Sequence, residues 1–245
     1  MRLVQFAALA IGLSAAGWAQ LAKEPLKSAA EVLDRYQQAL GGPEAIRKVQ
    51  SETVHGEIEA TGISAKATFV YYAKPFKTLI KVKHPDGSEV IAGFDGKTSW
   101  TVTPQGASLD TDTPVESVRR DADLQYPLHE PDYFQKLELA GVTDFEGHHC
   151  YWLHGTTHWG KDNNQFYDVG TGLLAGYRFQ TDDGSGRVAI ATFEDFKDFG
   201  GPLVATRNTT RVGDRYQTFI YKSISYDALP DSTFDIPPSV KALMH

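Results

Sequence analysis

The residue types best suited to chemistry are concentrated in one short segment. This segment runs from His148 to His154, has the sequence HHCYWLH and combines two metal-ligating types, histidine and cysteine. Alternate residues of a β-strand share a face, so His148 and Cys150 are expected to point the same way and could bind one ion. His154 shares that face but lies about 13 Å beyond Cys150, at about 3.3 Å per residue, which is too far for the same ion. A metal site therefore requires ligands from other strands. The alternative interpretation is a strand whose polar face is rich in histidine.

Motifs of nucleophilic catalysis are absent from the sequence. It contains no G-x-S-x-G, S-x-x-K or H-E-x-x-H motif and no glycine-rich phosphate loop. Cys150, the single cysteine, cannot form an internal disulfide, and on a strand we expect a small core residue rather than an exposed nucleophile. We therefore assign no catalytic residue, no metal ligand and no cofactor. The enzymatic alternative is a metal-dependent hydrolase that uses the strand carrying His148 and Cys150.

Aromatic side chains occur mostly in segments that we expect to be strands. A curved antiparallel sheet has one concave face, and incomplete cover of that face leaves an apolar cavity, the usual form of a small-molecule site. The candidate residues for lining such a cavity are Phe69, Tyr71, Phe94, Trp100 and Trp152. The alternative interpretation is that these rings fill an ordinary core.

Two short helices are expected near the N-terminus. Ser28 and Glu31 have the spacing of a capping box, which satisfies amide groups at the start of a helix. The apolar residues that follow recur at helical intervals and form one face: Ala29, Leu33, Tyr36 and Leu40. The pair Gly41-Gly42 ends this helix, and Pro43 suits the first turn of a second helix that reaches Val49.

From Ser51 onward the apolar period changes to two, the period of half-buried strands. Tight-turn signals such as Pro85-Asp86-Gly87 separate successive strands, which favours an antiparallel meander over β-α-β units. A helical insert is expected between Asp110 and Glu138, and the strands number roughly a dozen. Because no linker rich in proline and serine divides the chain, we expect one domain, residues 20–245.

Residues 1–19 have the composition of a cleavable export signal. Arg2 precedes an apolar stretch, and Gly17 and Ala19 suit cleavage before Gln20. A membrane span needs about 20 apolar residues, and this stretch is shorter. The alternative to a cleavable signal is an N-terminal helix that stays attached to the protein. We therefore expect a periplasmic or secreted protein with no transmembrane segment after cleavage. The formal net charge of −7 opposes binding to nucleic acid.

Five motifs, in order along the chain, resemble those of one protein family. They are ALGGPEA at 39–45, GFDGKTSW at 93–100, FYDVGTGLL at 166–174, DFKDFGGPL at 195–203 and STFDIP at 232–237. Together they are similar to bacterial periplasmic proteins of the lipoprotein-carrier (Lol-type) superfamily, in its branch of outer-membrane lipoprotein-sorting-like proteins. The resemblance implies a mainly β fold with accessory helices. Its form would be an incomplete antiparallel β-barrel of about eleven strands, with helices covering the concave face.

The resemblance also implies a function without catalysis. It implies a periplasmic binding or carrier protein for a lipophilic ligand, either a lipid or the acyl chains of a lipoprotein, that requires no cofactor. Burial of apolar ligand surface would drive binding, at about 25 cal/mol per Å² removed from water. A third possibility, beside the carrier and the hydrolase, is an interaction module for a protein partner in the cell envelope.

Overall fold

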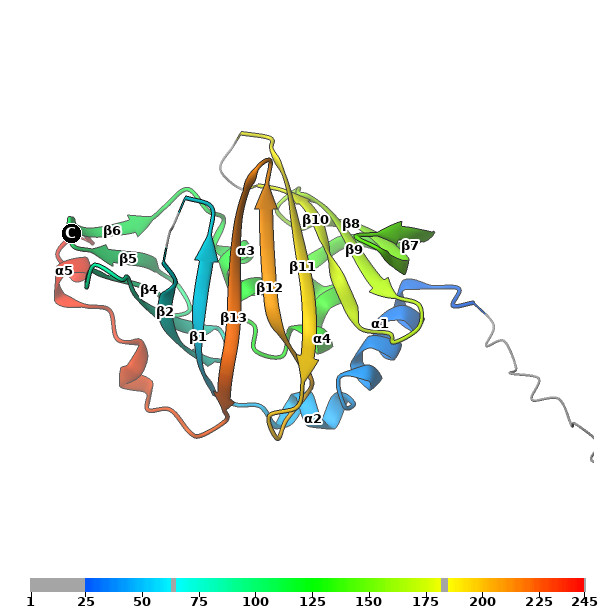
Figure 1. Ribbon diagram of the computed structural model, residues 1–245, viewed down its shortest axis with the longest axis horizontal. Coiled ribbons are helices and arrows are strands. Elements are labelled where there is room, and N and C mark those ends of the chain that lie inside the picture. Colours follow the sequence, from blue (N-terminus) through cyan, green and yellow to red (C-terminus); the bar gives the residue numbers. More distant parts are fainter. Residues whose placement is uncertain (1–24, 63–64, 182–184, 245) are drawn as a thin grey trace, which may run out of the picture.

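A single antiparallel sheet, covered by helices on one face, dominates the structure (Figure 1). The computed structural model describes residues 25–62, 65–181 and 185–244, so the predicted export signal at residues 1–19 lies outside the described residues. Within that part of the chain the sheet has thirteen strands, in the order β6-β5-β4-β3-β2-β1-β13-β12-β11-β10-β9-β8-β7. The sheet does not close, because β6 and β7 are its two edges. The predicted mainly β fold in the form of an incomplete barrel is therefore confirmed.

The strands follow one another along the chain with these bounds: β1 Glu52–Ala60, β2 Ala67–Lys74, β3 Lys77–Lys83, β4 Glu89–Phe94, β5 Ser99–Thr103, β6 Gly106–Asp110, β7 Phe134–Phe145, β8 His148–Thr157, β9 Asp162–Asp168, β10 Leu174–Gln180, β11 Val188–Lys197, β12 Val204–Val212 and β13 Arg215–Ser225. The helices are α1 Ala29–Ala39, α2 Pro43–Lys48, α3 Val115–Asp121, α4 Tyr126–His129 and α5 Pro238–Lys241, with short 3₁₀ turns at Glu130–Tyr133 and Asp231–Phe234. Strand β6 pairs with β5 in a hairpin. It is not among the strands that the period-two apolar pattern predicts.

The chain builds the sheet as two halves that meet in the middle. Strands β1 to β6 form one half, and each pairs with its neighbour in the sequence. The segment containing α3 and α4 then leads to the opposite edge, where β7 begins the second half. The last strand, β13, pairs with β1, with Val54 opposite Ile224. This central pair places residues from both ends of the chain side by side.

The N-terminal helices form as their local signals predict. The Ser28 hydroxyl accepts a hydrogen bond from the Glu31 amide at 3.2 Å, while the Glu31 carboxylate accepts from the Lys27 amide at 2.6 Å. The second bond of the capping box therefore comes from the Lys27 amide, one residue before the expected Ser28 amide. Helix α1 is followed by Gly41 and Gly42 with φ of 111° and 90°, a region that glycine adopts without a Cβ penalty. This turn leads directly into α2.

Helix α1 packs its apolar side against the second half of the sheet. Its buried residues Val32, Leu33 and Tyr36 join one hydrophobic cluster with residues of β8, β9 and β10. Tyr36 and Tyr167 of β9 lie with their ring centroids 5.2 Å apart. Helices α1, α2 and α4 contact one another and together form the cover of the inner, concave face.

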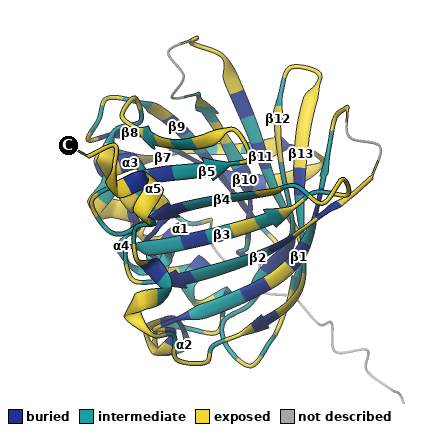
Figure 2. Cartoon of the chain, turned by 90° about the vertical axis from the view of Figure 1, so that its left-hand side faces the viewer, coloured by how far each residue is buried: buried dark blue, intermediate teal, exposed yellow. Residues whose placement is uncertain are grey.

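The outer face of the sheet is also buried at one place. The C-terminal segment crosses strands β3 to β6 on the side away from α1, and α5 lies there in Figure 2. Phe234 and Val240 of this segment pack against Leu79 and Trp100. This half of the sheet is therefore apolar on both of its faces.

Candidate functional site: a cavity under the helices

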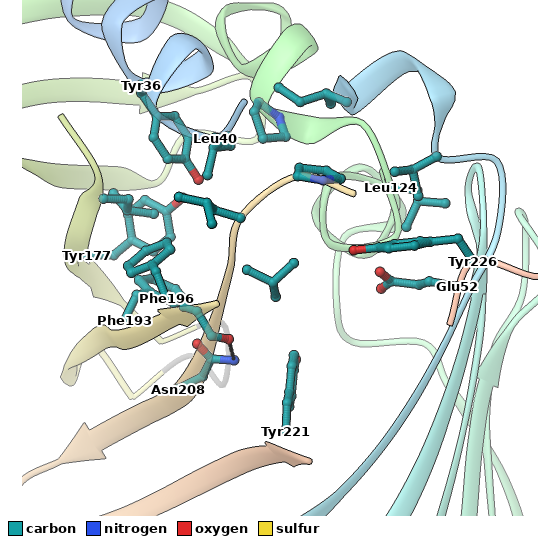
Figure 3. A pocket seen from close by; sticks show the side chains of 18 residues that line it. Tyr36, Leu40, Glu52, Leu124, Tyr177, Phe193, Phe196, Asn208, Tyr221 and Tyr226 are labelled. Atoms are coloured by element: carbon teal, nitrogen blue, oxygen red, sulfur yellow. Dashed lines mark hydrogen bonds between the residues drawn. The ribbon is translucent and has the colours of Figure 1, made fainter. Parts of the chain in front are cut away.

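A cavity of about 290 Å³ lies between the helical cover and the inner face of strands β10 to β13 (Figure 3). Its size is near the lower end of the range for small-molecule sites, about 300–1,000 Å³. Most of the lining residues are apolar, and they come from both the helices and the sheet: Leu40, Ile46, Val49, Leu124, Pro127, Leu174, Phe193, Phe196, Pro202, Leu203, Val204 and Ala205. The remaining lining residues are Tyr36, Glu52, Tyr177, Asn208, Tyr221 and Tyr226.

Strand β11 places two phenylalanine rings in this cavity. Phe193 pairs with Asn208 and Phe196 pairs with Ala205, so the register between β11 and β12 continues unbroken. Between the two rings, Asp195 has a left-handed φ of 56°, and its carbonyl oxygen accepts a hydrogen bond from the Thr206 hydroxyl at 2.7 Å. A left-handed residue departs from extended strand geometry and interrupts the regular alternation of the side chains. Phe193 and Phe196 both line the cavity although they are three positions apart.

A second compartment of about 420 Å³ adjoins the first. Tyr177 and Phe193 line both, and their rings meet edge to face with centroids 5.4 Å apart. The second compartment is more polar and contains Arg120, which binds Asp121 at 2.7 Å. The inner face therefore offers an apolar compartment next to a polar one.

The wall of the first compartment on the side of β1 carries polar groups. Burial raises the pKa of Glu52 to about 7, so this carboxyl holds its proton up to near-neutral pH. The hydroxyl of Tyr226 and the Oδ1 atom of Asn208 are buried, and neither has a hydrogen-bond partner within the described part of the chain. An unpaired buried polar atom costs about 1–3 kcal/mol. These atoms are therefore the natural contacts for a polar group of a ligand.

A buried hydrogen-bond network fixes the cover to the sheet. Glu130 has none of its surface exposed, and its carboxyl accepts hydrogen bonds from the hydroxyls of Tyr126 and Tyr167, each at 3.0 Å. Burial raises the pKa of Glu130 to about 7. Next to it, Asp123 accepts from the Tyr133 hydroxyl at 2.7 Å. The network joins the α4 region to β9 and so holds the roof of the cavity in place.

The turn between β9 and β10 anchors α1. The guanidinium group of Arg35 donates to the carbonyl oxygens of Val169 at 2.6 Å and Gly170 at 2.9 Å. The Asp168 carboxylate shapes this turn by accepting hydrogen bonds from the amide and hydroxyl of Thr171. The motif at 166–174 therefore has a structural role, which is to hold the helix over the cavity.

The five aromatic residues proposed from the sequence divide between the two faces of the sheet. Phe69, Tyr71 and Phe94 belong to the inner face, but none of them is among the residues that line the cavity. A ligand contact for these three stays a prediction. Their strands, β2 and β4, lie in the first half of the sheet, whereas the lining strands are mainly β10 to β13.

Trp100 and Trp152 lie on the outer face, and neither is among the residues that line the cavity. Trp100 packs over Gly93 and joins the cluster formed with the C-terminal segment. Trp152 alternates with Tyr151 and Leu153, which face α1, so its ring lies on the opposite side and donates to Asn164 at 2.8 Å. Trp100 is buried under the C-terminal segment, and Trp152 is half-buried beside the outer-face cluster of Phe145, Cys150 and Phe166.

The strand on which the alternative hydrolase would depend carries a buried cysteine and an exposed histidine. Cys150 is fully buried beside Phe145 and Phe166, and burial raises the pKa of its thiol to about 11, which disfavours the thiolate. His148 is exposed, with its Nδ1 atom 3.4 Å from an Asp168 oxygen. Among the described residues, no three side chains of His, Cys, Asp or Glu are grouped closely enough to bind a metal ion.

Several cavity residues escaped the sequence analysis. Tyr177 lies two residues before Phe179 on β10, and Tyr221 lies two residues after Phe219 on β13. Residues two apart on a strand share a face, so each tyrosine has an aromatic neighbour on its own face. This period-two aromatic pattern could have identified them. Glu52 had no comparable signal, because a glutamate at the start of a strand is ordinarily a surface residue.

No protein-family model and no curated protein matches this chain. Three solved structures share its architecture. A DUF1329 family protein from Desulfovibrio piger matches with a TM-score of 0.59 and 15% identity over 84% of this chain and 96% of that one. A LolA superfamily protein from Nitrosomonas europaea matches with a TM-score of 0.59 and 14% identity over 86% and 99% of the two chains. A domain named for outer membrane lipoprotein sorting, from Vibrio parahaemolyticus, matches with a TM-score of 0.56 and 8% identity over 83% and 97%.

The chain has the LolA-type fold. The resemblance based on the five sequence motifs is thus confirmed at the level of architecture. At these identities the likeness concerns the fold alone, and function must be argued from the cavity. Across the residues that the structure describes, no helix combines the length and the apolar character required to span a bilayer.

Proposed function

We propose that this protein is a non-enzymatic binding or carrier protein for a lipophilic molecule, whose apolar chain occupies the cavity under α1, α2 and α4. The observation that carries the proposal is the cavity itself, with its lining of aliphatic and aromatic side chains from both cover and sheet. The LolA-type fold supports it, since one of the similar structures is named for lipoprotein sorting. The ligand is a lipid or the acyl chain of a lipoprotein.

The physical basis of binding is removal of apolar surface from water. Each methylene group that enters such a site contributes about 0.8 kcal/mol, which corresponds to about a fourfold gain in affinity. A preformed cavity requires little rearrangement, so less of this gain is lost to ordering of the protein. Phe193, Phe196 and Leu203 supply the contacts on the sheet side.

The proposal is tested with a fluorescent dye that is itself lipophilic, N-phenyl-naphthylamine, whose emission rises in apolar surroundings. We expect saturable binding of one dye per protein. Leu124 lies in the loop between α3 and α4 and lines the cavity, so the variant Leu124→Trp should fill part of it and weaken binding at least tenfold.

The matched control is Leu243→Trp, the same substitution at a residue that is 47% exposed and far from the cavity lining. It should bind the dye like the wild-type protein. Absence of saturable dye binding by the folded wild-type protein, or equal affinities in both variants, would contradict a binding function in this cavity.

We further propose that residues 20–245 act as one exported domain in the periplasm. The export signal expected at residues 1–19 and the lipophilic cavity support this location, in which lipid must cross an aqueous space. Mass spectrometry of the protein isolated from the periplasmic fraction tests it. A mass corresponding to a chain that begins at Gln20 is expected, and recovery of the uncut chain in the cytoplasm would argue against export.

A further inference from the structure

The polar wall of the cavity has the chemistry to recognise the head of the ligand. Glu52 is the first residue of β1 and Tyr226 directly follows β13, and because Thr53 pairs with Ser225 these two residues lie beside each other. Asn208 of β12 also lines the cavity, but it pairs with Phe219 and so lies further along the sheet. In Figure 3 the side chains of Glu52 and Tyr226 lie side by side, with their oxygen atoms directed into the cavity. Asn208 lies across the cavity from them, near Phe193 and Phe196.

Two of these side chains have unused hydrogen-bonding capacity. The amide nitrogen of Asn208 donates to the carbonyl oxygen of Ala205 at 3.3 Å, but its Oδ1 atom, an acceptor, has no partner in the described part of the chain. The buried hydroxyl of Tyr226, which can donate and accept, also has no partner there. Buried polar atoms in folded proteins are nearly always paired. A hydroxyl group of a ligand would satisfy the Tyr226 hydroxyl, and a second donor further along the ligand would satisfy Asn208 Oδ1.

The charges around this wall disfavour an anionic head. None of the described residues lining the cavity is Lys, Arg or His, and Glu52 is its single carboxylate. Arg120 belongs to the adjoining compartment, where Asp121 already holds it at 2.7 Å. An ionised carboxylate or phosphate at the wall would therefore meet no positive charge and would lie beside Glu52.

We propose that this wall binds an uncharged lipid head that carries a hydroxyl group, while the attached apolar chain fills the cavity. This inference rests on the proposed function and adds the chemical class of the ligand. A hydroxyl group can accept from the Tyr226 hydroxyl and donate to the neighbouring Glu52 carboxyl, whereas an ionised carboxylate can only accept. Glu52 in its protonated form offers one further donor, and in its ionised form it repels anions.

The test compares decyl alcohol and decanoate, which have equal chain lengths, as competitors of bound N-phenyl-naphthylamine at neutral pH. Decyl alcohol should displace the dye at about tenfold lower concentration, because decanoate lacks the donor and carries a charge. In Glu52→Gln this difference should shrink, since the repulsion of decanoate is removed. A tighter or equal affinity for decanoate in the wild-type protein would overturn the inference.

Tyr226→Phe removes one hydroxyl from the wall and should weaken the binding of decyl alcohol about fivefold to tenfold relative to that of decane, which has no hydrogen-bonding group. The matched control is Tyr216→Phe, at an outer residue that is 44% exposed, and it should have no effect. Thermal unfolding of each variant shows that it is folded. If every competitor displaces the dye equally in all variants, the head preference fails while the carrier function stands. If none displaces it, the proposed function itself fails.

Discussion

The buried carboxyl group of Glu130 makes the stability of this protein depend on pH. It lies between α4 and β9, where the hydroxyls of Tyr126 and Tyr167 donate to it at 3.0 Å. Burial raises its pKa from the ordinary 4.5 to about 7, and the hydrogen bonds and the charge of Arg120 offset only part of that effect. Ionisation of this group at neutral and higher pH therefore lowers the free energy of unfolding.

The sign of the effect follows from proton binding. Because the pKa is raised in the folded protein, the folded state binds this proton more tightly than the unfolded chain. The resulting stability is fully present below pH 4.5 and is lost as the pH rises through about 7. At about 1.4 kcal/mol per pH unit, the loss amounts to about 3 kcal/mol.

The variant Glu130→Gln keeps the size and an acceptor oxygen but cannot ionise. Urea unfolding at pH 5 and pH 8 measures the free energy of unfolding at both ends of this window. We expect the variant to gain about 3 kcal/mol relative to the wild-type protein on going from pH 5 to pH 8. Glu52, whose pKa is also raised to about 7, contributes equally to both proteins and cancels in the comparison.

Glu138→Gln is the matched control, because Glu138 is exposed on β7 and a hydrogen bond from Lys136 lowers its pKa. We expect the free energy of unfolding of this variant to show no gain over the wild-type protein between pH 5 and pH 8. Parallel pH profiles for the wild-type protein and Glu130→Gln would refute the argument, since they would mean that Glu130 ionises in the fold without cost.

Further predictions concern the cover, the outer face and the cavity. Arg35→Ala removes two hydrogen bonds to the β9–β10 turn, so it should destabilise the fold by about 1–3 kcal/mol and also weaken dye binding by loosening α1. Cys150 should react with a thiol reagent only after unfolding, and rapid labelling of the native protein would contradict its burial. Phe234→Ala should cost about 3–5 kcal/mol in urea unfolding, because this ring fills the outer-face cluster with Trp100. A series of straight-chain alcohols should displace the dye about fourfold better per methylene and then level off when the cavity is full, whereas an unchanging affinity would speak against burial of the chain.

Local signals were sufficient to predict the two N-terminal helices and most of the strands. The cap at Ser28 and the glycine pair at Gly41 act over a few residues, so they can be identified without knowledge of the fold. Strand β6 was missed because Gly106–Asp110 is short, contains glycine, alanine and serine, and has none of the β-branched or aromatic residues that mark strands. Its pairing with β5 is what makes it a strand.

The cavity was harder to predict, because alternation tells which residues share a face but not which face the helices cover. Trp100 was proposed to line the cavity, yet its ring is covered by the C-terminal segment on the outer face. That contact joins residues far apart in the chain and leaves no local pattern. The left-handed backbone at Asp195 also leaves no clear pattern in the sequence, yet it interrupts the alternation of β11 between Phe193 and Phe196, which both line the cavity.

The central claim is that an apolar chain lies between the helices and strands β10 to β13, and a bromine atom at the end of such a chain would report its position. Crystals of the protein with decyl alcohol brominated at its tail should show anomalous scattering from bromine inside the cavity, near Phe193 or Leu174. The hydroxyl end should lie toward Tyr226. Bromine bound only on the outer face, for example beside Trp152, or no bound bromine at a saturating concentration, would contradict the account.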